Sequence, residues 1–165
     1  MPLRLRSAFL ALAILFADQI TKLWVLFGVD LPARGRVPVM PFMDAVMVWN
    51  RGISYGLFQQ ETLMGRWLLF ALTLIACLFL ALWLWRETQR VTSLALALIL
   101  GGALGNGIDR AAYGAVVDFI LLHAAGYEWY VFNIADATIV AGVALLLYGA
   151  FSAKDKASVN PDQLS

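Results

Sequence analysis

Four long apolar stretches divide this chain, and they constrain its fold more than any other feature of the sequence. A transmembrane helix needs about 20 mainly apolar residues. Stretches that approach or reach this length run over residues 7–27, 67–85, 91–105 and 133–151. The whole chain is 62% hydrophobic and 14% charged, whereas a soluble domain is nearer half apolar and a quarter charged. The sequence therefore predicts a membrane protein, mainly α-helical, with four transmembrane helices.

The basic residues in the connections predict which side of the membrane each segment occupies. Four spans place both termini on the same side. The flanks on that side carry six Lys and Arg residues, against five on the other side, and an excess of such residues marks the cytoplasm. We therefore expect cytoplasmic termini, with residues 28–66 and 111–132 as outer connections. Residues 1–153 are expected to form a single domain, and the polar residues 154–165 a disordered cytoplasmic tail.

The first outer connection contains short segments that favour β-structure. Residues 37–42 and 45–49 are rich in Val, Met, Phe and Trp, with Pro and Asp at their ends. This composition is typical of short strands with marked boundaries. It predicts a small extracytoplasmic β-sheet within residues 28–66. Residues 111–132 are expected to form a second outer loop.

Polar and charged side chains gather at the predicted outer ends of the apolar stretches. Asp18 and Lys22 are four residues apart, so they share one face of the first helix. Further members come from the outer connections and from the ends of the third and fourth stretches: Asn50, Asn106, Asp109, Arg110, Asp118, Asn133 and Asp136. Ionisable groups at membrane depth are costly, and they are therefore candidates for a functional site.

Ordinary structural roles account for several of these residues when each is taken alone. Asp18 and Lys22 can form an internal ion pair that holds the first helix to the bundle. Asn133 can be a helix N-cap, and Asp136 can be a first-turn acid that the helix dipole favours. Asp118 is different, because it stands in the apolar run Val-Val-Asp-Phe-Ile. Neither a cap nor a surface ion pair explains a carboxyl group at that place.

Two aspartates that face each other provide a route to acid–base chemistry. A carboxyl group in apolar surroundings has a raised pKa, and a second carboxylate raises the pKa of one of the two further. The two can share one proton, so that one activates water while the other polarises a carbonyl. The sequence leaves open which two of Asp18, Asp109, Asp118 and Asp136 form such a pair. Asp109 can also form an interfacial ion pair of small net value with Arg110.

Five segments that carry these residues match the motifs of a known family. They are residues 18–22 (Asp-Gln-Ile-Thr-Lys), 50–56 (Asn-Arg-Gly-Ile-Ser-Tyr-Gly), 105–110 (Gly-Asn-Gly-Ile-Asp-Arg), 117–120 (Val-Asp-Phe-Ile) and 132–136 (Phe-Asn-Ile-Ala-Asp). In this order, they resemble lipoprotein signal peptidase (signal peptidase II), an aspartic peptidase family of the bacterial inner membrane. The resemblance spans nearly the whole chain. Ser54 and Tyr55 stand where the family often has Ala and Phe, and Gly107 stands where a bulkier residue is common.

The resemblance implies a function and a division of roles among the site residues. Family members remove the signal peptide of a prolipoprotein by cutting before a cysteine that already carries diacylglycerol. Asp118 and Asp136 would form the catalytic dyad. The residues that would support the site or hold substrate are Asp18, Lys22, Asn50, Gly52, Asn106, Asp109, Arg110 and Asn133. The chain would be a multi-pass monomer among the lipids of the bacterial inner membrane, with its active site near the outer surface.

Other classes of function fit the sequence less well. One His and one Cys predict no metal site, and at a net charge of +1 no nucleic-acid partner is expected; a cofactor is not expected either. The alternative function is a proton- or ion-coupled small membrane carrier, since intramembrane acids also build ion pathways. A carrier would be expected to have polar residues at mid-span in several helices, yet residues 67–85 carry no charge. A scaffold protein with a helix interface at Gly101 and Gly105 is a third possibility, but it leaves Asp118 unexplained.

Overall fold

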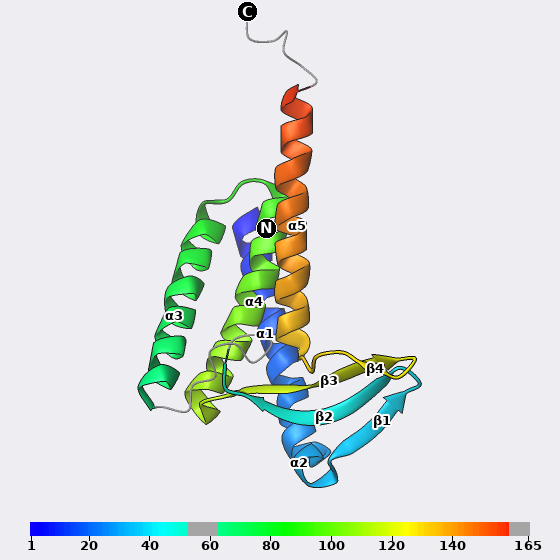
Figure 1. Cartoon of the computed structure of the whole chain (residues 1–165). Coiled ribbons are helices and arrows are strands. Elements are labelled where there is room, and N and C mark those ends of the chain that lie inside the picture. The colour runs from blue at the N-terminus through cyan, green and yellow to red at the C-terminus, as the bar shows by residue number, and fades with distance from the viewer. Residues whose placement is uncertain (53–62, 159–165) are drawn as a thin grey trace, which may run out of the picture.

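The structure is a bundle of helices with a β-sheet at one end (Figure 1). It is a computed structural model and describes residues 1–52 and 63–158 of the chain. Within that part of the chain, four helices are long and apolar enough to cross a membrane. They are α1 with its π-helical continuation η1, then α3, α4 and α5, at Leu3–Leu23, Trp24–Gly28, Leu63–Arg86, Arg90–Tyr113 and Ile134–Ser158. The prediction of four transmembrane helices is confirmed.

The helix α4 is longer than its hydropathy predicts. It continues from Gly105, the predicted end of the third span, to Tyr113. The polar residues in this extension lie against neighbouring elements of the protein, so they do not interrupt the helix. The helix ends where Gly114 adopts the left-handed conformation (φ 70°) and donates its N–H to the carbonyl of Arg110 at 3.0 Å. This is a common way to end a helix, because glycine adopts a positive φ without steric cost.

Two predicted segments fall partly outside the described residues. The helix α5 extends to Ser158, into the predicted tail of residues 154–165, because Ala and Lys continue a helix readily. Residues 159–165 lie outside the described part of the chain. Of the motif at residues 50–56, the structure describes residues 50–52 only, so Ser54 and Tyr55 are also outside it.

The helix α4 lies at the centre of the bundle. In its most apolar 18-residue window 56% of the residues are buried, against 33% for the first span and 11% for α3 and α5. Glycines let α1 and α5 approach it closely. A Cβ atom at Gly101 would lie 2.7 Å from the carbonyl oxygen of Ala11 in α1, and a Cβ atom at Gly102 would lie 2.5 Å from that of Ala135 in α5. The small residues of α4 therefore serve packing within this chain.

The β-sheet is antiparallel, with four strands in the order β1-β2-β3-β4. The strands are Arg36–Met40, Met43–Asn50, Val116–Ala124 and Tyr127–Glu128. The small sheet predicted in the first outer connection is present, but the second connection, predicted as a loop, supplies β3 and β4. In the β2–β3 register Val48 pairs with Asp118, and Asn50 pairs with Val116. The end of β2 is thereby placed beside Asp118.

An apolar cluster holds the sheet against the end of the first span. Its buried members are Val25, Leu26, Leu31, Val117 and Phe119. They come from η1, from the short helix α2 (Leu31–Arg34) and from β3. The sheet consequently lies across the end of the bundle, beside the start of α5 (Figure 1). This arrangement places the polar side chains of the sheet next to those of the helices.

Candidate active site

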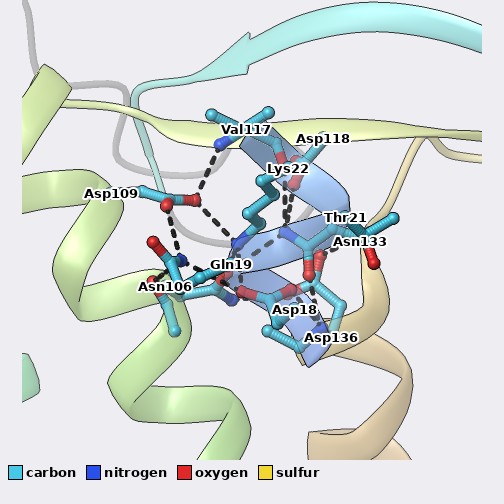
Figure 2. Close-up of polar contacts among 12 residues, drawn as sticks. Asp18, Gln19, Thr21, Lys22, Asn106, Asp109, Val117, Asp118, Asn133 and Asp136 are labelled. Carbon is cyan, nitrogen blue, oxygen red and sulfur yellow. Dashed lines mark hydrogen bonds and ion pairs between the residues drawn. The ribbon is translucent and has the colours of Figure 1, made fainter. Parts of the chain in front are cut away.

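The polar residues predicted from the sequence converge at the end of the bundle that carries the sheet, and Figure 2 shows members from α1, α4, β3 and the start of α5. They come from five elements and from the residues that flank them: Asp18 and Lys22 on α1, Asn50 on β2 with Gly52 just after it, Asn106, Asp109 and Arg110 on α4, Asp118 on β3, and Asn133 and Asp136 at the start of α5. Hydrogen bonds and ion pairs join them into one network around a buried cation, Lys22.

Lys22 is the buried cation of the network, with a side chain only 2% exposed. Its Nζ lies 2.8 Å from Asp18 Oδ2, 2.7 Å from Asp109 Oδ2 and 3.0 Å from Asn106 Oδ1. An ammonium group has three N–H donors, so each donor has its own acceptor. A buried charge is tolerated when it is paired and hydrogen-bonded. The predicted pair of Asp18 and Lys22 is thus present, with Asp109 as a second anion.

The two acids around Lys22 also tie the helices to the sheet. Asp18 Oδ1 accepts a hydrogen bond of 2.9 Å from the backbone N–H of Ala135, in the first turn of α5. Asp109 Oδ2 accepts one of 3.1 Å from the backbone N–H of Val117 in β3. N–H groups in the first turn of a helix have no acceptor within the helix, and a carboxylate satisfies them well. The pair therefore locks α1, α4, β3 and α5 together.

Two residues of the network were not predicted. Gln19 Nε2 lies 3.3 Å from Asp18 Oδ2, 3.0 Å from Asp109 Oδ1 and 3.1 Å from the carbonyl oxygen of Gly105. The hydroxyl of Tyr130 accepts a hydrogen bond of 3.2 Å from the side-chain amide of Asn50. Gln19 is adjacent to Asp18 in the sequence, but spacing within one helix does not predict its contact with Asp109 on α4. No local signal distinguished Tyr130 from other aromatic residues.

Asn133 joins the two acids of the predicted dyad. Its Oδ1 accepts the backbone N–H of Asp136 at 2.8 Å, and Asp136 Oδ2 lies 3.4 Å from the backbone N of Asn133. This reciprocal arrangement is a capping box, so the predicted N-cap is present. The side-chain amide has a second role, because Asn133 Nδ2 lies 2.7 Å from Asp118 Oδ1 and 3.1 Å from Asn106 Oδ1. One asparagine thus contacts Asp118 and Asp136 together.

Asp118 is fully buried, with 0% of its surface exposed. Its Oδ1 accepts a hydrogen bond from Asn133, and its Oδ2 accepts one of 3.0 Å from Asn50 Nδ2. Burial is the largest cause that raises the pKa of Asp118, and the negative charge of Asp136 is the second. The hydrogen bonds from the two asparagines and the charge of Lys22 oppose them. The balance raises the pKa of Asp118 to about 7.

Arg110 contacts backbone oxygens. Its Nη1 lies 3.4 Å from the carbonyl oxygen of Asn106, and its Nη2 lies 3.3 Å from that of Gly52. The ion pair considered for Asp109 and Arg110 is not formed. Asp109 forms an ion pair with Lys22 instead. Arg110 instead connects α4 with the segment that follows β2.

Asp136 lies on the walls of two cavities. The first has a volume of about 260 Å³, and its polar lining includes Asn50, Asn106 and Arg110. The second has a volume of about 430 Å³ and is mainly apolar; its lining includes Trp129, Tyr130, Phe132, Ala137, Ala141 and Ala144. Asn106 Nδ2 donates to Asp136 Oδ1 at 2.8 Å, which holds the carboxyl group at this boundary. Asp118, which is buried, and Asp136, which faces the cavities, are therefore connected through Asn133. This arrangement is suited to acid–base chemistry.

Among residues 1–52 and 63–158, His, Cys, Asp and Glu side chains form no group of three that could hold a metal ion.

Gly105→Ala is expected to destabilise the protein. A Cβ atom there would collide with Asp18 Oδ2 and lie 3.1 Å from Asp18 Cγ. Overpacking of this kind costs about 1–3 kcal/mol, more than the ~1 kcal/mol that a helix gains when Gly becomes Ala. Gly107→Ala is the matched control, because its Cβ would meet only Thr73 Cγ2, at 3.3 Å. The measurement is the Tm of both variants in one detergent, and equal Tm values would contradict the expectation.

Residues 10–152 match the sequence model of the Peptidase A8 family, signal peptidase (SPase) II. The lipoprotein signal peptidase of Methylobacterium radiotolerans is 57% identical over 157 residues, which cover 93% of this chain and 92% of that protein. The lipoprotein signal peptidase of Beijerinckia indica subsp. indica is 52% identical over 156 residues, which cover 94% of this chain and 92% of that protein.

Two solved structures have a similar fold. A bacterial membrane enzyme determined by the in meso method at 2.3 Å resolution superposes with a TM-score of 0.80 at 28% identity, covering 97% of this chain and 94% of that one. A second bacterial membrane enzyme, determined by the same method at 1.9 Å, superposes with a TM-score of 0.74 at 29% identity, covering 88% and 92%. The four spans and the sheet are therefore shared with enzymes of bacterial membranes.

Proposed function

This chain belongs to the signal peptidase II family, and on that basis we propose that it removes the signal peptides of bacterial prolipoproteins. The proposed cut is the peptide bond on the amino side of a cysteine that carries diacylglycerol. The observation that carries this mechanism is the placement of Asp118 and Asp136 on one asparagine, Asn133, beside two cavities. The chain is accordingly a peptidase, and its relatives do not support the ion-coupled carrier.

Charge pairing supports Asp118 and Asp136 as the catalytic pair among the four candidate acids. Asp18 and Asp109 both form ion pairs with Lys22. Neither Asp118 nor Asp136 forms an ion pair with a Lys, Arg or His side chain in the described part of the chain. The other oxygens of the two acids paired with Lys22 accept the backbone N–H of Ala135 and the side-chain amide of Gln19, so both acids are used in holding the elements of the site together. The pair without a cation is the one that can share a proton.

In the proposed resting state, the pair holds one proton at neutral pH. A pKa of about 7 leaves Asp118 about half protonated there. Asp136 faces both cavities and is proposed to be the ionised partner that meets water. The amide of Asn106 orients its carboxylate, and Asn133 sets the position of Asp118 relative to it.

A water molecule between the two carboxyl groups is the proposed nucleophile. Asp136 takes a proton from this water while the water oxygen bonds to the scissile carbonyl carbon, and the proton of Asp118 passes to the carbonyl oxygen. The tetrahedral intermediate then collapses. The C–N bond breaks, Asp136 gives its proton to the leaving nitrogen, and the hydroxyl proton returns to Asp118. Both acids end in the state in which they began.

The proposed site lies at the outer surface of the inner membrane, with both termini in the cytoplasm. The sheet and the start of α5 lie together at one end of the four spans (Figure 1). A cysteine anchored by diacylglycerol would hold the scissile bond at that level of the bilayer. The apolar cavity beside Asp136 suits an apolar part of such a substrate. Asp118, Asp136 and the asparagine that joins them lie on one chain, so the proposed enzyme needs no residue of a second copy and is proposed to act as a monomer.

The function is tested by offering the purified protein a prolipoprotein with and without diacylglycerol on its cysteine. Product masses should place the cut before the modified cysteine. The unmodified precursor should be cleaved at least about 10²-fold more slowly, because remote binding energy positions the reacting bond. Ion flux without cleavage in proteoliposomes would favour a carrier, and equal cleavage of both precursors would contradict the proposed substrate.

The proposed acid role of Asp118 predicts how activity depends on pH. The neutral form of Asp118 must donate a proton, and its pKa is raised to about 7. Raising the pH through this value removes the proton, so kcat/KM should fall by about tenfold per pH unit above it. The measurement is kcat/KM for a diacylglyceryl-modified prolipoprotein across this range. A rate that stays level from about pH 6 to about pH 9 would exclude a required acid with this pKa.

A further inference from the structure

An apolar groove opens at the end of the bundle opposite the sheet, where α1, α3 and α4 meet. It has a volume of about 250 Å³. Its floor includes Ala11, Leu84 and Leu100, which are 3%, 4% and 7% exposed. Its rim includes Leu12 and Ala81, which are exposed. The alanines leave a hollow between two membrane-spanning helices, so the groove lies where acyl chains surround the protein.

Arg4 and Trp85 stand at the mouth of this groove. The guanidinium carbon of Arg4 lies 5.0 Å from the centre of the Trp85 ring, within the range of a cation–π contact. Both side chains are exposed, Trp85 by 56%. From Arg4 to Leu12 the helix rises about 12 Å. The groove therefore runs from the membrane interface, where Trp is favoured, into the hydrocarbon region.

The charge around the mouth is positive. Three further arginines lie at the same ends of these helices: Arg6, Arg86 and Arg90. Glu87, the acid in the adjoining α3–α4 connection, is already engaged by Trp83 Nε1 at 3.1 Å and by the next two backbone N–H groups at 2.8 Å each. Among the described residues, Arg4 forms no ion pair with a carboxylate. Its guanidinium is thus available to an external anion.

We propose that this groove binds an anionic phospholipid, with one acyl chain between α1 and α3 and the phosphate on Arg4. A guanidinium group presents several N–H donors in one plane, which matches phosphate oxygens. The contact with Trp85 holds this guanidinium group over the ring at the mouth of the groove. The apolar floor matches the acyl chain of such a lipid, and the guanidinium group of Arg4 at the mouth matches its phosphate. This site is independent of the proposed catalytic pair at the other end of the bundle.

The test is lipid binding by the full-length purified protein in a neutral detergent, measured by native mass spectrometry. The probes are phosphatidylglycerol and phosphatidylcholine with the same acyl chains. The wild type should bind phosphatidylglycerol about fivefold more tightly, which corresponds to about 1 kcal/mol. Arg4→Gln should abolish this preference. Arg6→Gln is the matched control, because it removes a charge from the same helix end outside the groove, and it should keep the preference.

A second variant tests the groove itself. Ala81→Leu fills the rim and should weaken the binding of both lipids. Equal affinity of the wild type for the two lipids would overturn the proposal, and so would an equal loss of preference in Arg4→Gln and Arg6→Gln. A dimer that Ala81→Leu disrupts would show that a second copy of the chain occupies the groove, which would also overturn it. Should Ala81→Leu fail to fold, the comparison of Arg4→Gln with Arg6→Gln decides the question.

Discussion

Asp118→Asn and Asp136→Asn are each expected to reduce kcat/KM for a diacylglyceryl-modified prolipoprotein by about 10³-fold or more. General acid–base catalysis contributes about 10²–10⁴-fold for a positioned group. At position 118 an amide has no acidic proton for the carbonyl oxygen, and at position 136 it cannot take a proton from water. Asparagine keeps the size of aspartate and one of its two acceptor oxygens, so the variants should fold. The measurement is the initial cleavage rate, with Tm recorded for each variant.

Asp44→Asn is the matched control for these two variants. Asp44 is a buried aspartate of the same sheet, where it pairs with Arg36 and lies 3.3 Å from His123 Nε2. Its replacement removes a buried carboxylate without touching the proposed dyad. Cleavage by Asp44→Asn should stay near the wild-type rate once the folded fraction is matched. If Asp118→Asn were as active as this control, the proposed dyad would be wrong.

Asp118→Asn should also stabilise the folded protein at high pH. The pKa of Asp118 is raised from 3.8 to about 7, so ionisation costs more in the folded state than in the unfolded state. The stabilisation that its neutral form supplies is present below pH 4 and is lost as the pH rises to about 7. About three pKa units correspond to at most ~4 kcal/mol. The Tm advantage of Asp118→Asn should therefore grow between about pH 4 and about pH 7, and a constant difference would contradict the raised pKa.

Lys22→Met is expected to destabilise the protein by about 3–5 kcal/mol, the cost of removing one partner of a buried ion pair. Asp18 and Asp109, exposed by 0% and 1%, would then be left as buried acids without their cation. Their other hydrogen bonds reach the start of α5 and β3, so the loss should loosen the junction of helices and sheet as well. The measurement is the free energy of unfolding in mixed detergent, with recovery of the folded state on refolding as the check on reversibility.

Two further variants make the Lys22 experiment specific. Arg6→Met removes a cation from an exposed position of the same helix, and it should change stability by less than about 0.5 kcal/mol. Lys22→Met combined with Asp109→Asn should be less destabilised than the sum of the single variants, because the double variant leaves one unpaired acid rather than two. If Lys22→Met were no more destabilising than Arg6→Met, the network would not hold the bundle together.

Contacts within one helix could be predicted from spacing alone. Asp18 and Lys22 are four residues apart and form the expected ion pair at 2.8 Å. Asn133 and Asp136 are three residues apart and form the expected cap. Helical geometry is periodic, so such neighbours follow directly from the sequence. The four transmembrane helices could also be predicted directly from hydropathy, because the thickness of the bilayer sets the length of a span.

Contacts between distant segments could not be predicted in this way. Asn50 and Asp118 are 68 positions apart and meet only because β2 pairs with β3, and the strand β3 was predicted as a loop. Its apolar run of Val, Phe, Ile and Leu also fits a buried loop or a helix end until a partner strand is known. The ion pair of Lys22 with Asp109 likewise joins two helices, α1 and α4, and spacing within one helix does not predict it.

The central proposal is that Asp118 and Asp136 share one proton at neutral pH, and infrared spectroscopy of the carboxyl groups tests it most directly. A protonated carboxyl band should be present at about pH 6 and disappear with a midpoint near the pKa of about 7. The band should be missing in Asp118→Asn and retained in Asp44→Asn. A band that titrates only below about pH 5, or one that persists unchanged in Asp118→Asn, would contradict a shared proton on this pair.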